Sequence, residues 1–159
     1  LLFQRGQGHH HPLRVTTSTM SEEKDLIKLH ITMKEGGGES CWAERLSPTT
    51  ARIDNVPFTH TEFGFNDIVE FVDQGEGGYY EFTKVIEHKT KTIGFRYEVK
   101  EGEEIKAVYG KLHGYFEKEK NVAMEGLMAG MAVIAIPYDM EDRALIEMME
   151  AAPVATAPL

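Results

Sequence analysis

Beyond residue 19, four histidines and one cysteine are the side chains most able to do chemistry, and their spacing excludes the common sites. The histidines His30, His60, His88 and His113 have no second histidine or cysteine at metal-site spacing. The chain also lacks a nucleophile elbow, a phosphate-binding loop and a dinucleotide fingerprint. We therefore predict no catalytic residue, no metal and no cofactor, and interpret His30 and His88 as surface groups.

The single cysteine, Cys41, lies between Glu39 and Glu44 in an expected short strand. A reactive thiol needs a basic neighbourhood or a helix N-terminus, so Cys41 is predicted to be passive, and a lone cysteine cannot form an internal disulfide. Carboxylates are abundant, but an acid–base pair requires two of them to converge across a cleft. Enzymatic activity therefore stays open, with the absence of motifs arguing against it.

One segment stands out as a candidate binding patch, formed by Trp42, Glu44, Asp54 and Asn55. Its structural interpretation makes Trp42 an anchor in the core and lets Asp54 and Asn55 shape the turn before Pro57. Its functional interpretation makes the four side chains a rigid patch on a sheet. The residue types favour the structural interpretation.

The last expected helix contributes two further candidates, Glu147 and Glu150. Both lie towards the C-terminal end, where the helix dipole opposes negative charge. Arg143, four residues before Glu147, is their only intrahelical partner. These acids either belong to an ordinary solvated surface or contact a basic partner.

The elements that must position these residues follow from hydrophobic periodicity. Apolar residues alternate with polar ones up to residue 99 and then recur at helical spacing after Gly102. Gly114 is predicted to end the first helix, and Asp139 to cap the second. The expected strands are 25–33, 40–46, 51–56, 67–73, 79–88, 93–99, 115–122 and 131–136, and the expected helices are 103–113 and 139–151.

This order predicts an α+β fold, because a run of strands precedes the helices. We expect an N-terminal twisted or barrel-like, mostly antiparallel β-sheet within residues 24–100, in which 79–88 and 93–99 form a hairpin. A helix-strand-strand-helix layer from residue 103 should pack against it.

The chain is interpreted as a leader, one domain and a tail. Residues 1–19 resemble a protease-site remnant and a shortened histidine tag, residues 20–152 are predicted to form a single α+β domain, and residues 153–159 a flexible tail. We expect a cytoplasmic protein without a membrane segment, acting as a monomer or homodimer. The net charge of −9 disfavours nucleic acid and favours a basic protein partner.

Three segments together resemble a known family. They are Glu39 with Trp42-Ala43, Ile53-Asp54-Asn55-Val56-Pro57-Phe58, and Asp67-Ile68-Val69. This combination is similar to the bacterial domain-of-unknown-function family four-two-six-five, over about residues 26–152. The resemblance implies a small bacterial protein and supplies no catalytic residues.

Three functions remain as hypotheses. The first is a non-enzymatic acidic binding protein that neutralises or regulates a basic partner, as an immunity protein or antitoxin does. The alternative is a small-molecule or nucleotide-binding protein, which could be an enzyme, using a pocket between sheet and helices. The third is a mimic of nucleic acid.

Overall fold

The first five strands form a closed barrel. A computed structural model describes residues 23–58 and 62–159, so the predicted leader and His60 lie outside the described residues. Each strand pairs antiparallel with the next, and a short parallel pairing of β1 with β5, Leu29 with Tyr80, closes the barrel. The strands are β1 (Leu26–Thr32), β2 (Gly38–Arg45), β3 (Thr50–Ile53), β4 (Ile68–Asp73) and β5 (Tyr80–Glu87).

Alternation along these strands explains why they fold into a barrel. In β1 the side chains of Ile27, Leu29 and Ile31 all point into the core, while the residues between them face outwards. Phe71 of β4 and Ile53 of β3 are fully buried in the same cluster. The predicted barrel-like sheet, and with it the α+β fold class, is confirmed.

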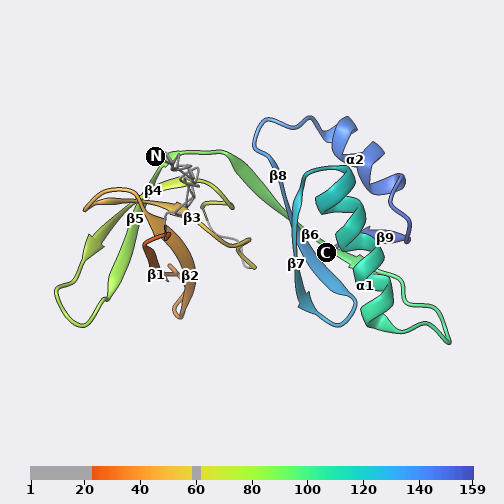
Figure 1. Cartoon of the computed structure of the whole chain (residues 1–159), viewed down its shortest axis with the longest axis horizontal. Helices are drawn as coiled ribbons and strands as arrows, with labels where there is room; N and C mark the ends of the chain where they lie inside the picture. The colour runs from red at the N-terminus through yellow and green to blue at the C-terminus, as the bar shows by residue number, and fades with distance from the viewer. Residues whose placement is uncertain (1–22, 59–61) are drawn as a thin grey trace, which may run out of the picture.

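The second lobe is a four-stranded sheet with two helices on one face (Figure 1). Its elements follow the order β6 (Thr90–Tyr97), α1 (Ile105–His113), η1 (Gly114–Glu119), β7 (Ala123–Met128), β8 (Met131–Pro137), α2 (Asp142–Glu150) and β9 (Thr156–Pro158). The strand order β7-β8-β6-β9, antiparallel throughout, is the split β-α-β-β-α-β arrangement of ferredoxin-like domains.

The predicted hairpin of 79–88 with 93–99 is wrong. β5 belongs to the barrel, whereas β6 is a central strand of the second sheet and pairs with β8 and β9. The barrel-like sheet therefore does not extend to residue 100. Alternation identifies a strand but not its partner, so the sequence could not place β6 in the other sheet.

The first α-helix ends at His113, as predicted, with Gly114 at its C-cap, but the strand expected after it is wrong. Gly114 has right-handed helical angles, φ −60° and ψ −43°, and the chain continues as the π-helix η1 instead of a strand over 115–122. Tyr115 and Phe116 are buried because this extension turns them into the core. The second helix begins after Glu141 instead of Asp139.

The segment predicted to be a flexible tail is part of the sheet. Thr156 pairs with Tyr97 and Pro158 with Phe95, so β9 forms an edge strand beside β6. The pairing continues upstream, where the N–H of Glu98 donates to the carbonyl of Ala155 at 3.0 Å. Residues 153–158 therefore complete the second lobe.

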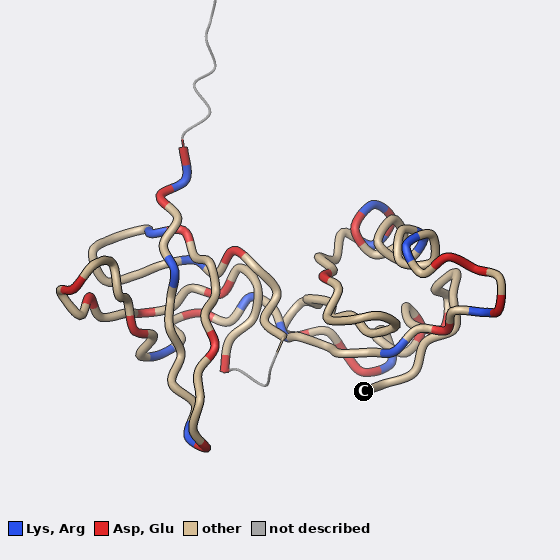
Figure 2. Tube along the Cα trace, turned by 90° about the horizontal axis from the view of Figure 1, so that it is seen from below, with Lys and Arg blue, Asp and Glu red and all other residues tan. Residues whose placement is uncertain are grey.

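A small apolar cluster joins the barrel side to the open face of the second sheet. Val56, from the loop after β3, packs with Val133 and Ala135 of β8, and its N–H donates to Glu125 Oε1 at 3.1 Å. Acidic and basic residues are spread over both lobes (Figure 2). No helix among the described residues is long and apolar enough to cross a membrane.

Candidate functional site

Trp42 lies on the outside of the barrel, which corrects its predicted role as a core anchor. Its side chain is 50% exposed, and the Lys28 ammonium lies 5.8 Å from the ring centroid. The reason is strand parity, since Cys41 and Ala43 on either side of it point into the barrel core. Trp42 therefore shares the outer face with Glu44.

The other residues of the predicted patch surround Trp42 and are tied to the chain. Asn55 Oδ1 accepts the N–H of Trp42 at 2.7 Å, and the N–H of Asp54 donates to the Trp42 carbonyl at 2.9 Å. Asp54 pairs with Lys24 at 3.3 Å, and Glu44 pairs with Arg52 at 3.1 Å. Because each carboxylate has its own cation, the patch offers a partner little free negative charge.

Glu147 and Glu150 lie on the other lobe, on α2. Glu147 Oε1 accepts from Nε of Arg143 at 3.2 Å, which confirms the predicted intrahelical pair. Glu150 is exposed and has no ion pair or hydrogen bond to its side chain within residues 23–58 and 62–159. The structure therefore divides the six predicted residues between two surfaces, one per lobe.

Glu150 lies at the edge of an apolar groove of about 420 Å³ between α2 and the strands β6 and β9. It is the only charged residue among the described residues that line the groove. The helix contributes Leu145, Ile146 and Met149, and the sheet contributes Ile93 and Phe95. The floor is apolar and the rim carries one carboxylate.

The strand β9 creates this groove. Its pairing with β6 holds residues 154–158 opposite the last turn of α2. The facing side chains there are small, Ala152, Ala155 and Ala157, so they leave space that larger residues would fill. Ile146 also lines the groove, and more than half of this apolar residue is exposed to solvent.

The electrostatics of the groove favour a cation. The C-terminal end of α2 carries the negative pole of the helix dipole, and Glu150 is its last residue. The dipole that disfavours an acid at this position adds to the carboxylate in attracting a positive group. An apolar groove bordered by such a site suits a ligand with an apolar body and a basic group.

Cys41, His30 and His113 are accounted for structurally. Burial, reinforced by the carboxylate of Glu39, raises the pKa of the Cys41 thiol to about 12, so it is no nucleophile. His30 stacks on Tyr79, and His113 lies 3.2 Å from Glu117. No group of histidine, cysteine and acidic side chains in the described residues could hold a metal ion.

The sequence pointed to Glu150 but missed the groove beside it. The groove depends on β9, which lies in the predicted tail, and on a pairing between residues about 60 positions apart. The only signal in the sequence was Glu150 itself, a carboxylate at the C-terminal end of a helix, where the helix dipole opposes negative charge. Its position opposite a short strand could not be inferred.

Comparisons with known proteins show the fold and the family. No curated protein matches the chain. A solved structure of a hypothetical protein from Neisseria gonorrhoeae is similar over 94% of this chain and 96% of that one, with 16% identity and a TM-score of 0.52. At that identity the likeness concerns the fold alone. The profile of the family described as "Domain of unknown function (DUF4265)" matches residues 39–152, which include all three segments of the resemblance noted in the sequence. The chain therefore belongs to the DUF4265 family.

Proposed function

We propose that the protein binds a basic partner protein through the groove between α2 and β9. The partner would insert an apolar side chain into the groove and place a lysine or arginine against Glu150. Binding would neutralise or regulate that partner in the cytoplasm, as an immunity protein or antitoxin does, with the protein acting as a monomer or homodimer. The family itself has no assigned function.

The observation that carries the proposal is the position of Glu150, a carboxylate without a partner in the described part of the chain, at the rim of an apolar groove. Interfaces commonly combine an apolar anchor in a pocket with a charged or polar rim. Glu147 and Asp142, the one acid of the first turn of α2, lie on the same helix, where Arg143 is the only base. The groove would therefore contribute packing, and the helix would contribute attraction at longer range.

The test uses charge reversal on α2. Glu147→Lys together with Glu150→Lys should slow association with a partner captured from the native host, because complementary charge mainly accelerates encounter. Raising the salt concentration should slow the wild type in the same way through screening. Glu76→Lys with Glu101→Lys changes the net charge equally at exposed acids elsewhere and serves as the matched control.

A second variant separates packing from attraction. Ile146→Ala removes apolar surface at the groove without changing charge, and should raise the dissociation rate more than it lowers the association rate. The proposal is wrong if the charge-reversed protein associates as fast as its control at every salt concentration. It is equally wrong if Ile146→Ala leaves the lifetime of the complex unchanged.

A further inference from the structure

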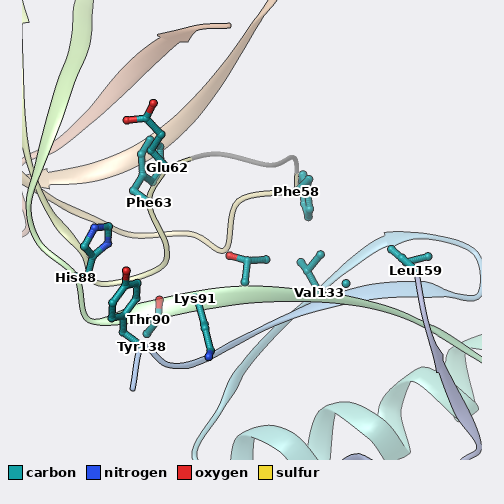
Figure 3. A pocket seen from close by; sticks show the side chains of 11 residues that line it. Phe58, Glu62, Phe63, His88, Thr90, Lys91, Val133, Tyr138 and Leu159 are labelled. Atoms are coloured by element: carbon teal, nitrogen blue, oxygen red, sulfur yellow. The ribbon is translucent and has the colours of Figure 1, made fainter. Parts of the chain in front are cut away.

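A second cavity, of about 410 Å³, lies on the opposite face of the second sheet from the groove (Figure 3). Ile134 and Ile136 of β8 pack under the helices, so Val133, which comes directly before Ile134, faces this other side. The barrel side contributes Phe63, and the connection between β5 and β6 contributes His88. Its volume is within the range of small-molecule sites.

His88 is held in this cavity by a fully buried carboxylate. Asp67 is 0% exposed, and its two oxygens accept the backbone N–H groups of Gly64 at 2.8 Å, Lys89 at 2.6 Å and Thr90 at 3.1 Å. The fourth contact is with His88 Nδ1, 3.3 Å from Asp67 Oδ2. A carboxylate only accepts, so Nδ1 carries the hydrogen.

This contact determines what the other ring nitrogen can do. With the hydrogen on Nδ1, the Nε2 atom of the neutral imidazole is an acceptor. In the part of the chain that the structure describes, Nε2 has no hydrogen-bond partner. The ring is fixed further by Tyr138, which stacks on it with centroids 4.4 Å apart and planes 10° from parallel. Asp67 and Tyr138 therefore orient an acceptor that nothing in the described protein uses.

A second polar atom in the same cavity also lacks a partner. Thr92 Oγ1 is buried without a hydrogen bond among the described residues, and Thr92 lines the cavity. A buried hydroxyl without a partner costs free energy that a bound molecule would recover. By contrast, the hydroxyl of Thr90 next to it donates to the Phe65 carbonyl at 2.6 Å.

Apart from the charged residues Glu62 and Lys91, of which Lys91 donates to the Met140 carbonyl, the rest of the cavity is apolar and aromatic. In Figure 3, Phe58, Val133 and Leu159 lie away from the stacked pair of His88 and Tyr138. At that end the Leu159 side chain packs directly on Gly94, where a Cβ would come within 2.7 Å of it. The cavity thus has a polar end and an apolar end.

We propose that this cavity is a small-molecule site for a hydroxylated aromatic compound. The ligand hydroxyl donates to His88 Nε2, a ligand oxygen receives the Thr92 hydroxyl, and the aromatic body lies along Phe58 and Val133. His88 is a binding residue, and Asp67 is a positioning residue that acts through it. The site is independent of the partner-binding groove on the other face of the sheet.

The test uses pairs of probes that differ in one hydrogen-bond donor. One- and two-ring hydroxyaryl ketones, such as para-hydroxyacetophenone, are titrated beside their methyl ethers into the full chain. Binding is followed by amide shifts at Thr92 and Gly94 and by the nitrogen-15 shift of His88 Nε2. The hydroxyl compounds should bind here, and the ethers about tenfold more weakly, because they leave Nε2 unpaired.

Two variants and a control assign the effect to residues. His88→Phe keeps a ring against Tyr138 and removes Nε2, so it should reduce the affinity for the phenols to that for the ethers. His30→Phe is the matched control, because His30 also stacks on a tyrosine, with centroids 4.4 Å apart, outside the cavity. Thr92→Val removes the unpartnered hydroxyl while conserving shape, and should weaken phenol binding without destabilising the protein.

Several results would overturn the proposal. One is the absence of shifts at Thr92 and Gly94 with every probe up to its solubility. Another is equal affinity for phenols and ethers, which would show that Nε2 is not used. If His88→Phe does not fold, the comparison of probes on the wild type and on Thr92→Val still decides, since unchanged phenol affinity in Thr92→Val also contradicts the assigned contacts.

Discussion

The side-chain oxygen of Asn55 accepts a hydrogen bond of 2.7 Å from the backbone N–H of Trp42 and so ties the loop after β3 to the middle of β2. The indole itself lies outside the core, while the backbone beneath it is held from the neighbouring turn. We therefore expect the side chain of Asn55, although it is smaller, to contribute at least as much to the stability of the fold as the indole of Trp42.

For Asn55→Ala we expect a loss of about 1 kcal/mol in the free energy of unfolding, because the Trp42 amide loses its acceptor. Asn55→Asp keeps an oxygen at that position and should lose less. Urea denaturation of the three proteins measures the difference. Equal stability of Asn55→Ala and wild type would contradict the role assigned to this bond.

Trp42→Ala should cost about 1 kcal/mol or less, since half of the side chain is already in water. Phe71→Ala in the barrel core is the comparison, and should cost about 3–5 kcal/mol through the cavity it leaves. Thermal melts of both variants test this. A large loss in Trp42→Ala would return the indole to the role of a core anchor.

Gly114→Ala should stabilise the protein by about 0.5–1 kcal/mol. Gly114 has ordinary helical angles, and a Cβ there would meet nothing within 4 Å, so alanine gains helix propensity without a clash. Gly130→Ala is the contrasting variant, because its φ of +77° is strained for alanine and should make it less stable. A destabilised Gly114→Ala would argue that the chain turns at this residue.

Stability should fall as pH rises above 9 through the single thiol. Cys41 has a pKa of about 12 in the folded protein, against 9.0 for the free side chain. Between these values the unfolded chain binds fewer protons, so the free energy of unfolding falls by about 1.4 kcal/mol per pH unit. Below pH 9 both states keep the proton and the effect disappears.

Cys41→Ala provides the reference for this pH effect. Burial also raises the pKa of Tyr109 and Tyr115, but these residues are present in both proteins and cancel in the difference. Urea denaturation over the alkaline range should show a steeper decline for the wild type. Parallel pH profiles would mean that the thiolate is tolerated in the barrel.

Local patterns predicted the five barrel strands, β6 and β8, because the alternation of apolar and polar residues reflects the two faces of a single strand. The same parity could have placed Trp42, since Cys41 and Ala43 are the small apolar neighbours that point inwards. The strand expected after Gly114 is wrong for another reason, because the chain continues there as the π-helix η1, which buries Tyr115 and Phe116.

What depends on distant pairing was not predictable from local sequence. Contacts between remote segments place β6 in the second sheet. They also form the strand β9 and the groove beside it. The same holds for the contact of Asp67 with His88, which are 21 residues apart. The sequence could assign Asp67 to a bend, but it could not show that Asp67 orients the ring of His88.

The carboxylate of Asp67 also bears on how the molecule loses its structure. It accepts a hydrogen bond from the backbone N–H of Gly64, beside the barrel. It accepts two more from Lys89 and Thr90, where β6, a central strand of the second sheet, begins. Unfolding of the barrel would therefore break hydrogen bonds that hold the start of that strand. We expect calorimetry to show one cooperative transition for both lobes, and Asp67→Asn to separate it into two.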